Sequence, residues 1–193
     1  MIDNSNLTNS FIGNLTRELV LICTDNHILN RQLYDIEELM EKWDASAPQY
    51  LADVVPEFSQ YPTVAIAWAA YYGMGAAVYW DCCWDNVKDT PDLYVAIRDK
   101  RGFDNMDDYV MEEMLGIKES SEDKRDADDA VRINDTIRKC AELALSKLTH
   151  QGIEPGTREA YLAFAKVAKL FFHLGVSIQL YRMGYRYEKM MQN

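Results

Sequence analysis

The chain has 193 residues, and its 20 Lys and Arg against 31 Asp and Glu give a formal net charge of −11. This charge disfavours a nucleic-acid interface, whose phosphate contacts require clustered basic side chains, and it disfavours docking on anionic lipid. The length suits a single domain spanning residues 1–193, and nine Gly with five Pro are few for an all-β chain.

Apolar residues recur with helical spacing through the first third of the chain. One stripe predicts a helix over about 5–26, and a second stripe predicts a helix over about 29–43. Pro48 and Pro56 then interrupt the pattern, so we expect a connection that contains a single helical turn at 49–54.

The segment from Thr63 to Lys88 is the most apolar in the chain. Its first 18 residues carry no charge, a length at which a membrane span must be considered. The segment is rich in Ala, Gly and Tyr rather than Leu and Ile, and no other segment offers a second span. We therefore expect Thr63 to cap the central helix of a soluble bundle, with no membrane as partner.

The second half of the chain also has a helical pattern. It predicts helices at about 91–101, with Pro91 in an early position, at about 105–115 and at about 120–149. Thr157 begins a last helix that runs to about 190. No segment shows a convincing alternation of apolar and polar residues, the pattern of a half-buried strand. The predicted fold class is an all-α bundle of five to seven helices, four of them long.

The four cysteines favour a reducing compartment. Cys82 and Cys83 are adjacent, and neighbouring residues on a helix point about 100° apart, so we expect them to be poor partners for each other. Cys23 and Cys140 complete the set, and the chain contains no C-x-x-C pair. The first residues lack the features of a secretory signal. We therefore expect free thiols and a cytoplasmic protein.

Two predicted helices end in charged residues on otherwise apolar faces. Small residues at steps of four on helix 63–88 lead to Asp81 and Asp85, and the apolar face of the last helix leads to Arg182 and Arg186. If the two helices run parallel, the four side chains can form an ion-pair network, whereas antiparallel helices would hold them at opposite ends. Either helix end can instead emerge into solvent.

Two further polar residues lie within the long helices. Asn134 interrupts the apolar face of helix 120–149, where we expect a buried amide that fixes the helix register. His173 shares one face of the last helix with Lys166, Lys169 and Ser177, and we expect that face to be solvated.

No catalytic, metal-binding or phosphate-binding motif is complete in this sequence, so we expect no metal and no cofactor. The nearest arrangement is a set of helical carboxylates, Glu38 and Glu41 with Asp81 and Asp85. A Mg²⁺-dependent hydrolase, one alternative function, would have to bring these carboxylates together around one ion.

Charge and aromatic content favour a different function. Residues 104–129 hold 11 acidic and three basic residues, a net charge of −8, which predicts either a docking surface for a basic partner or a solvated face. The 12 Tyr, 4 Trp and 6 Phe favour protein contacts, including a homodimer. The main prediction is a non-enzymatic protein–protein interaction module, of adaptor or immunity type, whose partner the sequence does not identify.

A second alternative is a helical module that binds a small apolar ligand. Tyr72, Tyr79 and Trp80 crowd helix 63–88. They predict an aromatic pocket beside this helix, unless the rings fill the core of the bundle.

Overall fold

The computed structural model describes residues 4–90 and 92–186, so Pro91 and the predicted last turns of the final helix lie outside the described residues. The described residues form an all-α bundle with no strand among them, which confirms the predicted fold class. The helices are α1 (Asn4–Asp25), α2 (Glu37–Glu57), α3 (Pro62–Val87), α4 (Leu93–Arg98), α5 (Met106–Asp108), α6 (Lys124–Thr149) and α7 (Arg158–Arg182). A 3₁₀ turn, η1 (Phe103–Asn105), precedes α5, and a π-helical turn, η2 (Tyr109–Met114), follows it.

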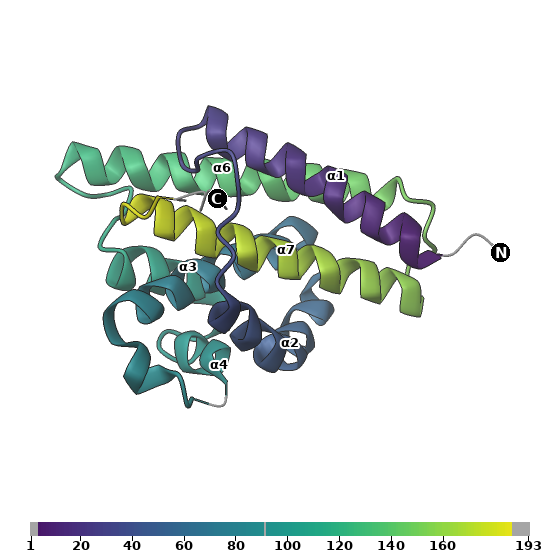
Figure 1. The fold of residues 1–193 in the computed structure, drawn as a ribbon, viewed down its shortest axis with the longest axis horizontal. Coiled ribbons are helices and arrows are strands. Elements are labelled where there is room, and N and C mark those ends of the chain that lie inside the picture. The colour runs from purple at the N-terminus through teal and green to yellow at the C-terminus, as the bar shows by residue number, and fades with distance from the viewer. Residues whose placement is uncertain (1–3, 91, 187–193) are drawn as a thin grey trace, which may run out of the picture.

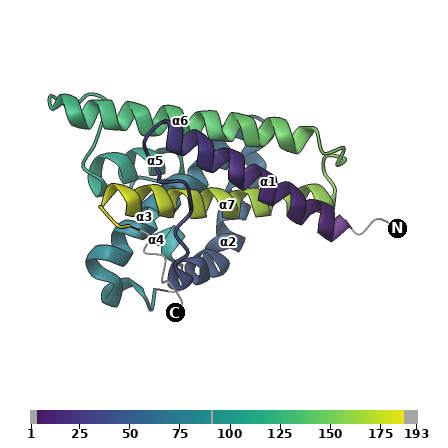
Figure 2. The ribbon, with the colours of Figure 1, turned by 45° about the horizontal axis from the view of Figure 1, so that its top comes forward.

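The centre of the bundle is the contact between α3 and α7. In Figure 1, α7 crosses the middle of the view, with α1 and α6 on one side and α2 and α4 on the other. Figure 2 shows α1 lying along α6 and α7. A Cβ atom at Gly73 would lie 2.1 Å from the carbonyl oxygen of Phe172, and one at Gly175 would lie 1.9 Å from that of Ala70. The two backbones therefore touch, and both positions require glycine.

α3 and α7 run in the same direction. Near their starts, the ring of Phe58 lies 4.8 Å from the ring of Phe164. Near their ends, the hydroxyl of Tyr185 donates a hydrogen bond to Oδ1 of Asp81 at 2.6 Å. Of the two helix arrangements that the sequence left open, parallel and antiparallel, the structure therefore has the parallel one.

α2 differs most from the sequence prediction. It begins later than predicted, because the chain first turns at His27 and Arg31, which have φ angles of 59° and 57°. It then continues through Pro48 where the sequence predicted a connection. A proline inside a helix costs about 3 kcal/mol, but Trp43 and Tyr50 are buried on the same helix, and each buried ring contributes roughly 1.5–3 kcal/mol. Burial thus outweighs the lost backbone hydrogen bond.

The starts of the other helices follow ordinary capping chemistry. Asp92 caps α4, Asp123 caps α6 and Thr157 caps α7, each by accepting a hydrogen bond from a backbone N–H of the first turn. Thr157 is the predicted cap. α3 begins at Pro62 rather than at a capping Thr63, because proline is favoured in the first turn, where its missing N–H costs nothing.

The last helix ends earlier than predicted. Gly184 has a φ of +95°, and its N–H donates to the carbonyl of Tyr181 at 3.1 Å. The next N–H, of Tyr185, donates to the carbonyl of Leu180 at 3.0 Å. This pattern is the Schellman C-cap, in which a glycine in the left-handed conformation ends the helix. Arg186 therefore lies beyond α7 rather than on its apolar face.

Part of the face of α7 that we expected to be solvated, at His173 and Ser177, is covered by the segment before α2, whereas Lys166 on the same face is exposed. Ser177 is fully buried, and its Oγ accepts a hydrogen bond from the N–H of Tyr34 at 2.8 Å. His173 Nε2 donates to the carbonyl of Tyr34 at 2.8 Å, and burial lowers the pKa of His173. The prediction of a solvated His173 is wrong, because a loop distant in sequence packs over it.

Among the described helices, only α7 is long and apolar enough to cross a membrane by length and composition. Of its most apolar stretch, 67% is buried inside the bundle. The core helix of a soluble protein meets the same criteria, so α7 is weak evidence for a membrane span.

Candidate functional site

The carboxylates of the predicted magnesium site do not converge. Glu38 and Glu41 are exposed on α2. Asp85 forms an ion pair with Lys88 at 2.7 Å, and its side chain is 90% exposed. Within residues 4–90 and 92–186 there is no group of three or more His, Cys, Asp or Glu side chains that could hold a metal ion. The hydrolase alternative therefore lacks the arrangement it requires.

The predicted ion-pair network between α3 and α7 does not form, although the two helices run parallel. Tyr185 occupies the place opposite Asp81, because the chain turns back at Gly184. The guanidinium of Arg186 instead lies 5.0 Å from the ring of Tyr181, and its Nη1 donates to the carbonyl of Tyr185 at 2.9 Å. Arg182 is exposed. The signal that was missed is Gly184. Interpreted as a helix stop, it places Arg186 outside the helix.

The predicted aromatic pocket beside α3 is filled core. Tyr72 is fully buried, and its ring lies 4.8 Å from that of Phe172. Its hydroxyl donates to Oγ of Ser46 at 3.0 Å. Tyr79 and Trp80 are half-buried, and burial raises the pKa of Tyr79 to about 12. These rings stabilise the bundle, and neither of the two pockets described next includes them.

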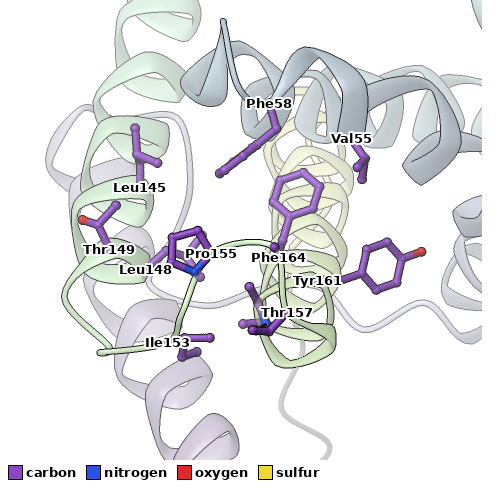
Figure 3. Close-up of a pocket in the computed structure, with 13 residues that line it drawn as sticks. Val55, Phe58, Leu145, Leu148, Thr149, Ile153, Pro155, Thr157, Tyr161 and Phe164 are labelled. Atoms are coloured by element: carbon purple, nitrogen blue, oxygen red, sulfur yellow. Dashed lines mark hydrogen bonds between the residues drawn. The ribbon is translucent and has the colours of Figure 1, made fainter.

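The first pocket is apolar and lies between the ends of α2 and α6 and the start of α7. Its volume is about 370 Å³. Figure 3 shows Phe58 and Phe164 facing each other, with side chains of α6 on one side of them and Val55 and Tyr161 on the other. The α6 side chains are Leu145, Leu148 and Thr149. We call this hollow the apolar pocket.

The hydroxyls of the apolar pocket already have backbone partners. Thr149 Oγ1 donates to the carbonyl of Ser146 at 2.8 Å. Thr157 Oγ1 donates to the carbonyl of Glu154 at 2.7 Å and accepts from the N–H of Ala160 at 3.2 Å. Because these groups are satisfied within the chain, the pocket has little with which to orient a polar ligand, and its chemistry favours an apolar occupant.

The second pocket, also of about 370 Å³, lies between α3, the α5–η2 segment and the N-terminal half of α6. Tyr71 of α3 donates from its hydroxyl to Oδ1 of Asn134 at 2.8 Å. Nδ2 of Asn134 donates in turn to Oε1 of Glu119 at 2.9 Å. Asn134 is half-buried, and it links three segments of the chain in this pocket.

Carboxylates dominate the second pocket, which we call the acidic pocket. Asp107, Asp108, Glu112 and Glu119 line it, and Lys118 is the one basic residue among its lining side chains. Burial, reinforced by the charge of Asp108, raises the pKa of Asp107. An ionised carboxylate is therefore already unfavourable at this position, and a cation placed beside it would relieve that cost.

The turn η2 forms one wall of the acidic pocket. It is a π-helical turn, and such turns are rare and occur frequently at functional sites. The N–H of Leu115 donates to the carbonyl of Val110 at 2.9 Å, and Gly116 with a φ of +69° then ends the turn. The sequence predicted a helix here, but its pattern gave no sign of the wider π spacing.

Comparison of the chain with protein-family models, with curated proteins and with solved structures found no match.

Proposed function

We propose that the protein is a non-enzymatic interaction module, of adaptor or immunity type, that binds a basic protein partner in the cytoplasm. The observation that carries this proposal is the acidic pocket, in which four carboxylates surround a hollow of about 370 Å³ with one lysine among them. The four carboxylates of the pocket all belong to residues 104–129, whose net charge is −8. Glu112 is already paired with Arg101 at 2.9 Å, so a Lys or Arg side chain of the partner supplies the positive charge opposite Asp107, Asp108 and Glu119.

The geometry suits an arginine or lysine side chain better than a bound metal ion. The carboxylates lie around the hollow but do not form a group that could hold a metal in the described part of the chain. A guanidinium can instead reach several carboxylates through its fork of N–H donors. Opposite charges about 4 Å apart near a protein surface attract by roughly 4 kcal/mol before desolvation is counted. Several such contacts therefore give useful affinity even after that cost.

A labelled oligo-arginine peptide tests this proposal by fluorescence anisotropy. We expect binding that weakens as salt is added, and a roughly tenfold loss of affinity, about 1.4 kcal/mol, in the double variant Asp108→Asn/Glu119→Gln. The matched control is Glu38→Gln/Glu41→Gln, which removes the same two charges from the exposed face of α2. Equal losses in the two double variants would show that only net charge attracts the peptide, and would contradict the proposal.

A second candidate function, binding of a small apolar ligand, is favoured by the apolar pocket. Its volume lies within the range of small-molecule sites, which is roughly 300–1,000 Å³. Titration with the neutral probe N-phenyl-1-naphthylamine should increase the probe's fluorescence. The variant Ala160→Leu fills the pocket and should abolish the increase, whereas Ala45→Leu, on an exposed face of α2, should not. Equal fluorescence from both variants would place the probe elsewhere.

A further inference from the structure

The end of α3 brings two adjacent cysteines into contact. On a regular helix their side chains would point about 100° apart, which is why the sequence predicted poor partners. In the structure, Cys83 leaves the helical conformation, with φ −157° and ψ 36°. The Sγ atoms of Cys82 and Cys83 consequently lie 2.8 Å apart. The separation of about 100° does not hold here because it assumed an unbroken helix, whereas both cysteines are free thiols, as predicted.

This pair differs from the other two cysteines in its access to solvent. Cys82 is exposed and Cys83 is half-buried. Cys23 and Cys140 are both fully buried, with their Sγ atoms 3.9 Å apart between α1 and α6. The chain thus contains one accessible pair of thiols and one enclosed pair, which provides an internal control for any reagent.

Covalent geometry disfavours a disulfide within the accessible pair. Consecutive Cα atoms lie about 3.8 Å apart across a trans peptide, whereas disulfides usually span Cα separations of about 4.4–6.8 Å, and departures from that range make the bond easier to reduce. Cys82 and Cys83 therefore remain two free thiols with their sulfur atoms side by side.

We propose that Cys82 and Cys83 form a chelating dithiol site for a thiophilic ligand of the monosubstituted trivalent arsenical class. Thiolate sulfur is a soft ligand and selects soft centres. A structural metal ion needs about four ligands, and no group of three or more metal-binding side chains exists among the described residues. A monosubstituted arsenical needs only two sulfurs, because its own carbon substituent provides the third bond.

The chemistry of this binding balances without an oxidant. An arsenical oxide, R–As=O, takes up the two thiols to give R–As(S–Cys)₂. Two As–S bonds form, the arsenic–oxygen bond breaks, and the two thiol protons leave with the oxygen as one water molecule. Arsenic stays trivalent and sulfur is not oxidised. Hydrogen bonding with Cys82 raises the pKa of Cys83 to about 11, so Cys83 holds the proton that it gives up in this step.

The test uses phenylarsine oxide with the intact protein and mass spectrometry under native conditions. We expect one phenylarsenic group per wild-type chain, removed by a small dithiol but not by glutathione. Cys82→Ser and Cys83→Ser should each weaken binding by about a hundredfold or more, because the second sulfur acts through its high effective concentration. Cys23→Ser and Cys140→Ser should bind as the wild type does.

Two outcomes would overturn the proposal. The first is a wild-type protein that takes up no phenylarsenic although titration shows its accessible thiols to be reduced. The second is a Cys82→Ser variant that binds as tightly as the wild type. Because Cys82 is exposed, the serine variant should keep the helical circular-dichroism spectrum of the wild type, so loss of binding can be separated from loss of the fold.

Discussion

The two pockets have the same volume of about 370 Å³ and opposite chemistry. Both use α6 as a wall: the acidic pocket contacts it at Ala130 and Asn134, and the apolar pocket contacts it at Leu145 and Leu148. At a rise of about 1.5 Å per residue, the nearest of these contacts, at Asn134 and Leu145, lie roughly 16 Å apart along one helix. The volume of a pocket therefore says little about its ligand. The chemistry of the lining side chains determines which ligand it can bind.

The two pockets should also respond differently to solution conditions. Charge attraction at the acidic pocket is screened by salt, whereas apolar burial at the other pocket is strengthened by salts that are excluded from protein surfaces. Any ligand whose binding responds to salt in only one of these ways can thus be assigned to one pocket.

The largest effect is expected from Gly73→Ala, which disturbs the framework that supports both pockets. The added Cβ would lie 2.1 Å from a backbone carbonyl of α7, so α3 and α7 must separate. We expect a loss of several kcal/mol in the free energy of unfolding, of the order of 3–5, measured by urea denaturation.

Gly13→Ala is the matched control for that variant. Gly13 also lies within a helix, but an added Cβ there has no atom within 4 Å. Alanine is a better helix former than glycine by about 0.5–1 kcal/mol, so this variant should be as stable as the wild type or more so. A loss of stability similar in the two variants would refute close backbone contact as the reason for Gly73.

A smaller effect, confined to the acidic pocket, is expected from Tyr71→Phe. The change leaves Oδ1 of Asn134 without the hydroxyl that now bonds it at 2.8 Å, which should cost about 1–2 kcal/mol. Tyr161→Phe, at the partly exposed rim of the apolar pocket, should change stability by less than about 0.5 kcal/mol. The measurement is the thermal unfolding midpoint of both variants. Equal shifts of that midpoint would argue against a structural role for the Tyr71 hydroxyl.

The smallest effect concerns pH. Burial raises the pKa of Asp107 in the folded protein, so the native state retains this proton to a higher pH than the unfolded chain does. The wild type therefore loses stability as the pH rises from the ordinary aspartate pKa through the raised one. Asp107→Asn removes that loss and should be relatively more stable at neutral than at acidic pH. The measurement is the urea midpoint of the wild type and of Asp107→Asn at several pH values across this range. If the midpoints of the two proteins changed in parallel with pH, the account would be contradicted.

The sequence predicted the helical class and the central position of α3, because periodicity and apolar content act locally. It did not predict that α2 continues through Pro48, since that depends on rings of α2 packing against distant helices. The close contact of Cys82 with Cys83 was likewise invisible, because it follows from one backbone departure at Cys83.

The two pockets were predicted to different degrees. The acidic pocket lies in a segment whose charge was evident from the sequence, although the contact of Tyr71 with Asn134 was not. The apolar pocket was missed, because its walls come from segments about 106 residues apart, around Phe58 and around Phe164. The prediction of an aromatic pocket at Tyr72 failed because rings from distant segments of the chain fill that space.

Hydrogen–deuterium exchange in the presence of oligo-arginine tests the central claim most directly, because it reports on both pockets in one experiment. The account predicts slower exchange in η2 and in residues 117–120 of the acidic pocket, with unchanged exchange in residues 150–157 beside the apolar pocket. Unchanged exchange throughout, or protection centred on residues 150–157, would contradict it.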